Sequence, residues 1–368
     1  MSSQKPQVLF LGDLNESLPE FAQFKEKFDV IVRSFPHQHY KLTTADALIK
    51  KFSTDFSKIV AIYAGWMGFV PIGGLTPSLV EHLPASLKVI TSTPVGYDAY
   101  DVPALKSRGI QLYNSPSMGA GDVADTAMWH ILESFRYFKR FEKTAKERGH
   151  TLMAREDLQT KSFDIETGSL GVEKDDWLAN AFAFGEIAGG HPVIRLAGKT
   201  CGIVGLGRIG QEIAKRASAF GMNVVYTQRN ENKDMDYKYC KDVDELCSMS
   251  DCVVISCPGN ANTRGLIGKK QIDLMKTTAR LFNFGRGFII DEDYAIKRLE
   301  EGKLGWIGLD VFANEPMIDK RLLNRWDVSL TPHIGSSSVE TFDATAKFAL
   351  ANIYTVIVNG VDGQSRVC

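Results

Sequence analysis

The chain has 368 residues, of which 44% are hydrophobic and 24% charged, and its formal net charge is -1. This length suits two domains of a globular protein, and the balanced charge gives no electrostatic reason to expect nucleic acid or an anionic membrane as a partner. No apolar run approaches the ~18 residues that a membrane span needs. The N-terminus lacks the apolar core of a secretory signal, and the six cysteines lack metal-ligand spacing. We therefore expect a reduced, cytoplasmic protein without a metal site.

Strands and helices alternate through the first hundred residues. Short apolar runs predict buried strands, and between them apolar residues recur at helical spacing. This alternation predicts a parallel sheet with helices on its faces. The predicted strands are residues 7–11, 29–32, 58–62 and 88–91, and the predicted helices are 18–28 and 44–52.

The middle of the chain contains a predicted long helix, an irregular stretch and a second alternating series. The helix spans residues 122–148 and is apolar on more than one face, which hints at a subunit interface. Residues 150–191 form an acidic insertion, partly helical around 177–184, for which a functional lid and a disordered loop are both open. Strand and helix then alternate from 198 to 332, and a last helix spans 338–359. This order predicts a domain of residues 1–115 and 336–368, interrupted by a dinucleotide-binding domain of residues 116–335.

A glycine-rich turn links the first strand and helix of the second series. The apolar run at 199–204 leads into Gly205-Leu-Gly207-Arg208-Ile209-Gly210, and a helical pattern follows to Phe220. Between a strand and a helix, such a triplet is typical of dinucleotide sites, whereas a structural glycine turn is the alternative. Gly205 would allow the tight turn, Gly207 the approach of a pyrophosphate and Gly210 close helix packing. Arg208 and Ile209 would offer backbone N–H groups to the phosphates.

The end of the next strand predicts which dinucleotide binds. NAD sites usually carry Asp or Glu about 20 residues after the glycines, where it holds the ribose hydroxyls. This strand instead ends in Gln228-Arg229-Asn230. Arg229, helped by Gln228 or Asn230, could pair with a 2'-phosphate. We therefore expect NADPH (NADP) to be preferred over NADH (NAD), with a solvated surface arginine as the alternative.

Three later segments each place one polar residue beside a predicted strand. These residues are Arg286, Glu315 and His333. Reduction of a 2-oxo acid needs a permanent cation for the carboxylate, which Arg286 would supply. His333 would donate and accept the proton, and Glu315 would orient the imidazole.

Four motifs make the chain similar to the D-isomer-specific 2-hydroxyacid dehydrogenase family. The resemblance covers nearly the whole length except residues 150–191. It rests on Gly205-Leu-Gly-Arg-Ile-Gly210, Asn283-Phe-Gly-Arg-Gly287, Gly308-Leu-Asp-Val-Phe312 with Asn314-Glu-Pro316, and Thr331-Pro-His-Ile-Gly335. The strand end Tyr226-Thr-Gln-Arg229 resembles the NADPH-using glyoxylate/hydroxypyruvate reductase branch, and the whole chain is also similar to fungal D-mandelate dehydrogenases.

The resemblance implies an α/β fold with two doubly wound parallel-sheet domains, a Rossmann cofactor domain inserted into a flavodoxin-like substrate domain. It also implies a homodimer and an active site in the cleft between the domains. The family's catalytic residues fall on Arg286, Glu315 and His333. Its substrate-carboxylate loop resembles Pro94-Val-Gly-Tyr-Asp98, where Val95 and Gly96 would bind through backbone N–H groups. Its cofactor-lining residues fall on Cys257, Pro258, Asp310 and Gly335.

Two questions stay open. Trp66 follows the third predicted strand and either walls the substrate pocket or belongs to the core. The substrate is a small 2-oxo acid such as glyoxylate, hydroxypyruvate or phenylglyoxylate. A dinucleotide-sensing co-repressor that binds without turnover is the alternative function.

Overall fold

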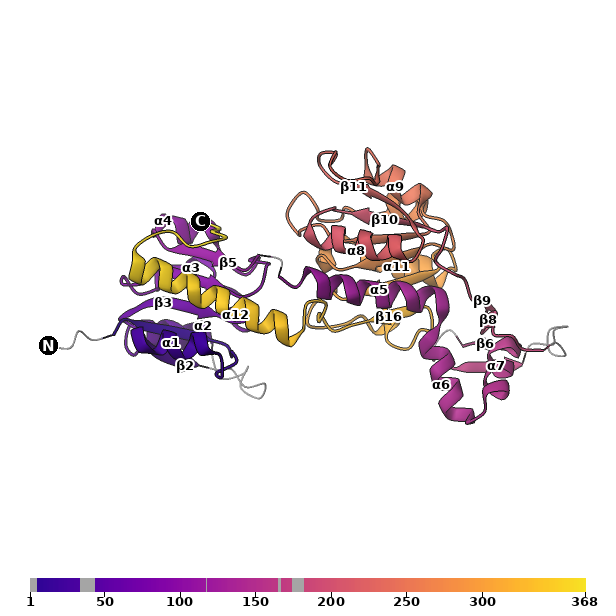
Figure 1. Ribbon diagram of the computed structural model, residues 1–368, viewed down its shortest axis with the longest axis horizontal. Helices are drawn as coiled ribbons and strands as arrows, with labels where there is room; N and C mark the ends of the chain where they lie inside the picture. Colours follow the sequence, from indigo (N-terminus) through magenta and orange to yellow (C-terminus); the bar gives the residue numbers. More distant parts are fainter. Residues whose placement is uncertain (1–4, 34–43, 117, 165–166, 174–181) are drawn as a thin grey trace. The chain divides into compact units, whose positions relative to one another are not determined.

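The computed structural model describes residues 5–33, 44–116, 118–164, 167–173 and 182–368 of the chain. The chain divides into two compact units (Figure 1). Unit 1 comprises Met1–Met118 and Ser337–Cys368, and unit 2 comprises Gly119–Ser336. The assignment of these units to substrate and cofactor binding stays a prediction.

Unit 1 contains a five-stranded parallel sheet with the strand order β2-β1-β3-β4-β5. This is the order of a flavodoxin-like sheet. The four predicted strands are confirmed with small shifts at their ends. The fifth strand, β5, escapes prediction because only its two central residues are buried. The strands are β1 (Gln7–Leu11), β2 (Asp29–Arg33), β3 (Ile59–Ala64), β4 (Val89–Ser92) and β5 (Gln111–Asn114).

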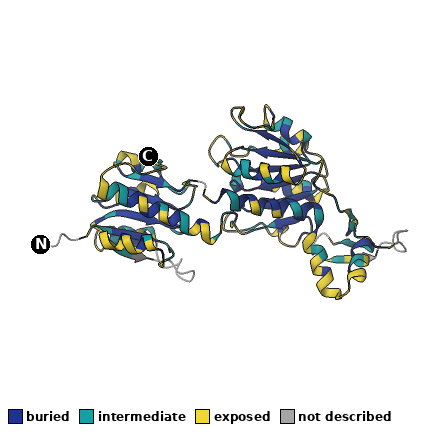
Figure 2. Ribbon diagram, viewed as in Figure 1, coloured by how far each residue is buried: buried dark blue, intermediate teal, exposed yellow. Residues whose placement is uncertain are grey.

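Helices cover both faces of this sheet, because alternate residues of each strand point to opposite sides. Val8 and Phe10 pack with α1 and α12, whereas Leu9 and Leu11 pack with α2, α3 and α4. Figure 2 shows the buried strands and the exposed outer sides of the helices. The helices are α1 (Pro19–Lys27), η1 (Val70–Ile72), α2 (Ala45–Phe52), α3 (Pro77–Glu81), α4 (Val102–Ser107), α12 (Val339–Tyr354) and the π-helical η5 (Thr355–Asn359).

Unit 2 contains a seven-stranded parallel sheet with the strand order β12-β11-β10-β13-β14-β15-β16. From β10 the chain adds β11 and β12 on one side, and it then crosses back and adds β13 to β16 on the other side of β10. Ligands of such sheets bind beyond the carboxyl ends of the strands at this switch point. The strands are β10 (Thr200–Val204), β11 (Asn223–Thr227), β12 (Lys238–Tyr239), β13 (Cys252–Ile255), β14 (Arg280–Asn283), β15 (Trp306–Leu309) and β16 (Val328–Leu330).

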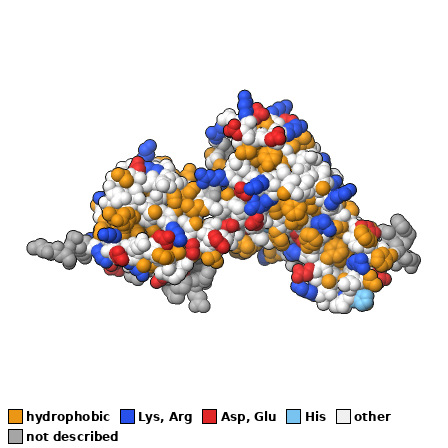
Figure 3. All heavy atoms as spheres, viewed as in Figure 1, with side chains coloured by type: hydrophobic (Ala, Val, Ile, Leu, Met, Phe, Trp, Pro, Cys, Tyr) orange, Lys and Arg blue, Asp and Glu red, His pale blue; other side chains and the backbone are white. Residues whose placement is uncertain are grey.

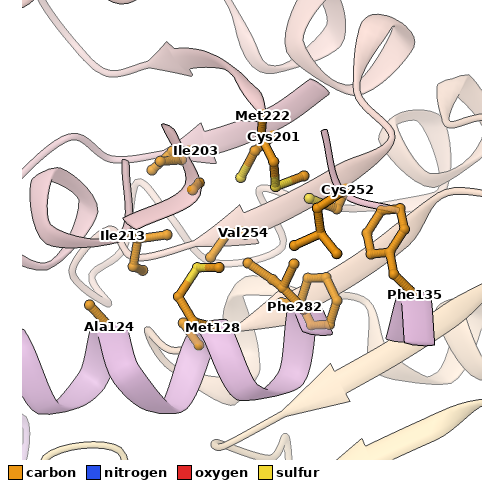
Figure 4. Close-up of a cluster of buried hydrophobic side chains, with 14 of the residues drawn as sticks. Ala124, Met128, Phe135, Cys201, Ile203, Ile213, Met222, Cys252, Val254 and Phe282 are labelled. Carbon is orange, nitrogen blue, oxygen red and sulfur yellow. The ribbon is translucent and has the colours of Figure 1, made fainter. Parts of the chain in front are cut away.

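Two hydrophobic clusters fill the faces of this second sheet. On one face, Met128 and Phe135 of α5 cluster with Val254 of β13 and Phe282 of β14 (Figure 4). Each such side chain contributes about 1.5–3 kcal/mol when fully buried, so α5 is firmly attached to the sheet. The opposite face packs against α9, α10 and α11. The helices of unit 2 outside the insertion are α5 (Ala120–Arg136), α6 (Phe138–Arg148), α8 (Arg208–Ala219), α9 (Val243–Met249), α10 (Lys269–Leu274), η3 (Gly287–Ile289), α11 (Glu292–Glu300) and η4 (Lys320–Leu322).

The prediction of one long helix over 122–148 is wrong, because the chain breaks at Tyr137. This residue adopts the left-handed conformation with φ 54° and separates α5 from α6. Its buried ring packs edge-on against Trp306 and at a tilt against Trp326. The Glu133 carboxylate then accepts the backbone N–H of Lys139 in the first turn of α6, at 3.0 Å. Burial of the ring and this cap favour the break over a continuous helix.

The described residues of the insertion at 150–191 form one helix and two short antiparallel strand pairs within unit 2. The insertion begins with α7 (Thr151–Thr160) and continues with two antiparallel pairs, β6 (Lys161–Phe163) with β7 (Leu170–Glu173) and β8 (Ile187–Ala188) with β9 (His191–Pro192). The ring of Trp326 stacks on Phe163 and on His191, with centroid distances of 5.2 and 3.9 Å. Of the helix predicted over 177–184, residues 177–181 lie outside the described residues. Residues 182–184 form no helix.

Charges of both signs occur on the visible surface. On the face shown in Figure 3, basic and acidic side chains lie among one another on both units, in keeping with the net charge of -1. That face therefore carries no large field of one sign. Within the described part of the chain, no helix has both the length and the apolar character that a bilayer crossing requires.

The break at Tyr137 generates a stability prediction. We expect Tyr137→Ala to lower the free energy of unfolding by about 3 kcal/mol, because it removes a buried aromatic side chain. Urea denaturation followed by tryptophan fluorescence measures this, since Trp306 and Trp326 contact the ring. Phe220→Ala is the matched control, because that ring is exposed and lies outside the helices for which a subunit interface is expected. An equal loss in both variants would contradict the anchoring role of Tyr137.

Candidate active site

The glycine turn after β10 leaves space where a ligand could approach. A Cβ atom on Gly205 would lie 2.8 Å from the Cα of Cys257, and one on Gly210 would overlap the carbonyl oxygen of Gly205. Packing therefore excludes side chains at both positions. A Cβ on Gly207 would meet nothing within 4 Å. Gly207 is also the N-cap of α8. Among the described residues the N–H groups of Arg208 and Ile209, at the start of this helix, donate to no backbone acceptor, so they are available to an anion.

The end of β11 carries a cation and no carboxylate. Arg229 is exposed, and among the described residues no ion pair engages it. The Gln228 amide donates to the carbonyl oxygen of Asn230 at 2.9 Å, and the Tyr239 hydroxyl donates to the carbonyl oxygen of Gln228 at 3.2 Å. These bonds fix the backbone around Arg229 and leave its guanidinium available to a phosphate.

The turn after β13 packs between the glycine turn and Arg286. Burial raises the pKa of the Cys257 thiol to about 11, so it stays protonated and serves as a packing group beside Gly205. Pro258 follows it. A Cβ on the next residue, Gly259, would overlap the side chain of Arg286. Gly259 is not among the site residues predicted from the sequence, although a glycine directly after the predicted Cys257-Pro258 turn is a signal for such a close contact.

Arg286 follows β14 in a turn held by Asn283. The Asn283 side chain accepts the N–H of Gly285 at 3.0 Å and donates to the carbonyl oxygen of Arg286 at 2.8 Å. The Arg286 guanidinium donates to the carbonyl oxygen of Gly285 at 2.9 Å. A Cβ on Gly287 would overlap the backbone at Phe312, so the two strand ends lie in direct contact.

His333 and Glu315 form a hydrogen-bonded pair. Nδ1 of His333 lies 3.1 Å from Oε2 of Glu315, and both side chains are partly exposed. The other carboxylate oxygen, Oε1, accepts the N–H of Phe312 at 3.0 Å. Burial raises the pKa of the Glu315 carboxyl, but the hydrogen bonds from His333 and Phe312 and the charges of His333 and Arg286 outweigh it, so the pKa lies below its ordinary value. Glu315 is therefore an ionised acceptor for the imidazole, and Arg286 acts on it electrostatically.

Asp310 holds the loop that carries His333. Its carboxylate is 4% exposed. Oδ1 accepts the Thr331 hydroxyl at 2.7 Å and the N–H of Ile334 at 2.9 Å, and Oδ2 accepts the N–H of Gly335 at 2.9 Å. A Cβ on Gly335 would lie 2.7 Å from Oδ2. Asp310 and Gly335, which the family resemblance places beside the cofactor, therefore also fix the two sides of His333.

The remaining predicted residues, Trp66, Val95 and Gly96, belong to unit 1. Trp66 follows β3 and its side chain is 41% exposed, so it is not an ordinary core residue. The Asn114 side chain donates to the carbonyl oxygen of Val95 at 2.6 Å. Within the described part of the chain, the N–H groups of Val95 and Gly96 donate to no protein acceptor. They are therefore available to an anion.

No metal centre accompanies these groups in the part of the chain that the structure describes, since it contains no cluster of three or more His, Cys, Asp or Glu side chains suited to a metal ion. The geometry brings Arg286, Glu315 and His333 together in unit 2, on the three strand ends that follow β14, β15 and β16. A permanent cation beside an imidazole with a carboxylate partner can bind an anion and exchange a proton with it.

The chain is similar to known proteins over both units. Residues 164–335 match the family model for the NAD-binding domain of D-isomer-specific 2-hydroxyacid dehydrogenases. A glyoxylate/hydroxypyruvate reductase of Arabidopsis thaliana is 33% identical over 280 residues, 76% of this chain and 78% of that protein. The holo form of Rhodotorula graminis D-mandelate dehydrogenase superposes with a TM-score of 0.82 at 28% identity, covering 99% of this chain and 98% of that one. An NADPH-dependent glyoxylate/hydroxypyruvate reductase of Sinorhizobium meliloti, in complex with NADP and malonate, gives a TM-score of 0.73 at 25% identity, covering 99% and 97%.

The glycine turn predicts that one alanine substitution lowers stability and that another weakens dinucleotide binding. Gly210→Ala should destabilise unit 2, because its methyl group would overlap the carbonyl oxygen of Gly205. Gly207→Ala has room and an allowed backbone conformation, with φ -75°, so it should change the free energy of unfolding by less than about 1 kcal/mol. Its methyl group would fill the space for the phosphates and raise the Kd of the dinucleotide about tenfold or more.

Thermal unfolding and fluorescence titration with NADPH measure the two effects. Unchanged dinucleotide affinity in a stable Gly207→Ala variant would show that the turn is structural only.

Proposed function

Because the chain belongs to the D-isomer-specific 2-hydroxyacid dehydrogenase family, we propose that it reduces small 2-oxo acids to D-2-hydroxy acids with NADPH. One observation carries this proposal above all: the 3.1 Å contact between His333 and Glu315, with the charge of Arg286 acting on the same carboxylate. An imidazole held by an ionised carboxylate, with a guanidinium charge acting on the same carboxylate, supplies the groups that reduction of a 2-oxo acid requires.

The glycine turn and the end of β11 fit a nicotinamide dinucleotide. Gly207 and the start of α8 would hold its pyrophosphate. Cys257, Pro258, Asp310 and Gly335 are proposed to line the rest of the site. When bound, the dinucleotide supplies the hydride. We propose NADP over NAD because the cation at the end of β11, Arg229, meets a 2'-phosphate without a neighbouring strand-end carboxylate to repel it.

The side chains divide the chemistry between charge and proton. Arg286 would bind the carboxylate of the 2-oxo acid and polarise its carbonyl group. Nδ1 of His333 donates to Glu315, which leaves Nε2 to give a proton to the carbonyl oxygen during reduction and to take it back during oxidation. Glu315 holds the ring orientation and stabilises the imidazolium that exists before the proton leaves.

We propose that unit 1 binds the substrate and that the α5 region forms a homodimer contact. The N–H groups of Val95 and Gly96 would bind the substrate carboxylate, with Trp66 as a wall for its side chain. This makes unit 1 the substrate domain and unit 2 the cofactor domain. Glyoxylate, hydroxypyruvate and the larger phenylglyoxylate are the substrates to compare. A homodimer through the α5 region stays a prediction, supported by the exposed rings of Trp129 and Phe138.

Loss of the imidazole should remove catalysis and spare cofactor binding. We expect His333→Asn to lower kcat by about 10²–10⁴-fold while the Kd for NADPH changes little. Asn is preferred to Ala as the first variant because His333 has φ 56°, a conformation that Asn tolerates. Steady-state assays with the three 2-oxo acids and fluorescence titration with NADPH provide the measurements. Loss of NADPH binding in this variant would assign His333 a structural role instead.

Activity of the unaltered protein separates the enzyme from a dinucleotide-sensing binding protein. Absence of turnover with every 2-oxo acid, together with tight NADPH binding, would favour the binding protein.

Arg229 should determine the choice of dinucleotide. We expect the kcat/KM of the unaltered protein to be higher with NADPH than with NADH. Arg229→Ala should lower this ratio about tenfold or more, because it removes a charge-assisted contact with the 2'-phosphate. Lys233→Ala, a cation four residues further along the chain, is the matched control for a general loss of positive charge. A clear NADH preference of the unaltered protein would overturn the assignment.

A further inference from the structure

A buried histidine in α5 takes no part in the proposed chemistry. His130 is fully buried, with its ring edge-on to the rings of Trp129 and Phe284. Nδ1 lies 2.7 Å from the Ser329 hydroxyl, and Nε2 lies 3.0 Å from the Thr331 hydroxyl. Burial, assisted by the charge of Lys139, lowers the pKa of His130 to about 3. The ring is therefore neutral, with one donor nitrogen and one acceptor nitrogen.

The partners of Asp310 fix which nitrogen is the donor. Its carboxylate accepts the N–H groups of Ile334 and Gly335, which can only donate, and it also contacts the Thr331 hydroxyl at 2.7 Å. A carboxylate with three such contacts is the acceptor in each of them. The hydrogen of the Thr331 hydroxyl therefore points to Asp310. The Thr331 oxygen must accept from His130, so Nε2 carries the hydrogen.

The contacts at the Ser329 side follow from this tautomer. A neutral ring with hydrogen on Nε2 has an acceptor at Nδ1, so the Ser329 hydroxyl donates to Nδ1 of His130. The indole N–H of Trp306, which can only donate, donates to the Ser329 hydroxyl oxygen at 3.0 Å. This contact is compatible with that direction, because a hydroxyl oxygen can accept while its hydrogen is donated.

We propose that His130 is a positioning residue for His333, acting as the Nε2–H tautomer through Thr331 and Asp310. Hydrogen bonds run in one direction from Trp306 through Ser329, His130 and Thr331 to Asp310. This direction leaves the Asp310 carboxylate as a pure acceptor for the N–H groups of the two residues that follow His333. His333 sits between Thr331 and those residues, in a left-handed conformation that the loop must hold against its intrinsic preference. The inference rests on the proposed role of His333 as the proton donor.

Two amide substitutions separate the two sides of the imidazole. His130→Gln places an amide N–H group near the position of Nε2 and keeps a donor for Thr331. His130→Asn is shorter, so it reaches only the Ser329 side, and His130→Leu keeps the volume without either hydrogen bond. We expect kcat to fall about 10–100-fold in the Asn and Leu variants and to recover most of this loss in the Gln variant. The Kd for NADPH should change less than twofold throughout, which separates catalysis from folding and cofactor binding.

Met128→Ala provides the matched control for a disturbed core, because Met128 lies on the same helix and is buried in the cluster of Figure 4. It should lower the unfolding temperature and leave kcat within twofold of the unaltered protein. A His130→Leu variant with unchanged kcat, or one that outperforms His130→Gln, would overturn the positioning role. That result is distinct from failure of the proposed function, which would appear as no turnover of any 2-oxo acid by the unaltered protein. It is also distinct from failure of the proposed role of His333, which would appear as turnover retained in His333→Asn.

The tautomer has its own readout on the unaltered full-length protein. The ¹⁵N resonances of the His130 imidazole should show a protonated Nε2 and an unprotonated Nδ1, unchanged across the pH range in which an ordinary histidine titrates. Assignment of the signal by its absence from the His130→Gln variant requires no activity. An imidazole with hydrogen on Nδ1, or one that titrates near its ordinary pKa, would contradict the proposed direction of the hydrogen bonds from Trp306 to Asp310.

Discussion

A buried carboxylate that must be fully hydrogen-bonded constrains the loop between β16 and the end of unit 2. Asp310 is almost inaccessible to water, and its three contacts come from Thr331, Ile334 and Gly335. An unmet acceptor at such a site costs about 1–3 kcal/mol or more, so the loop conformations that preserve all three contacts are strongly favoured. In that conformation His333 has φ 56° and its Nδ1 faces Glu315. The orientation of the proposed proton donor is thus a consequence of satisfying a different, buried residue.

Close backbone approach is the second constraint. Side chains are excluded at Gly205, Gly210 and Gly287 because each of these glycines touches backbone from another element. These contacts join the end of β10 to that of β13, at the switch point of the sheet, and the end of β14 to that of β15. Gly207 differs, since the space beside it is open. The same residue type therefore serves packing at three positions and ligand access at the fourth.

Much of the fold could be predicted from the sequence, because the patterns that indicate it lie within short stretches of the chain. Parallel strands buried on both faces appear as short apolar runs, and the strand–glycine–helix order marks the dinucleotide turn. The break in the helix predicted over 122–148 could not be predicted from the sequence. Tyr137 has no sequence signature of a helix end, since aromatic residues rarely adopt the left-handed conformation, and only the packing of its ring against Trp306 and Trp326 favours it. Strand β5 was missed because its run of buried residues is too short to predict alone.

The sequence by itself determined the two α/β units, the glycine turn, the absence of an acid at the end of β11 and the three polar residues proposed for catalysis. It could do so because each of these is a pattern within a short stretch of chain. Only the tertiary structure decided that Asp310 holds the His333 loop through hydrogen bonds, and that His130 links α5 to that loop through the Thr331 hydroxyl. It also decided that Gly259 is needed beside Arg286. These relationships depend on atoms about 20 to 200 residues apart in the chain, and their hydrogen-bond directions follow from which groups burial forces to share a partner.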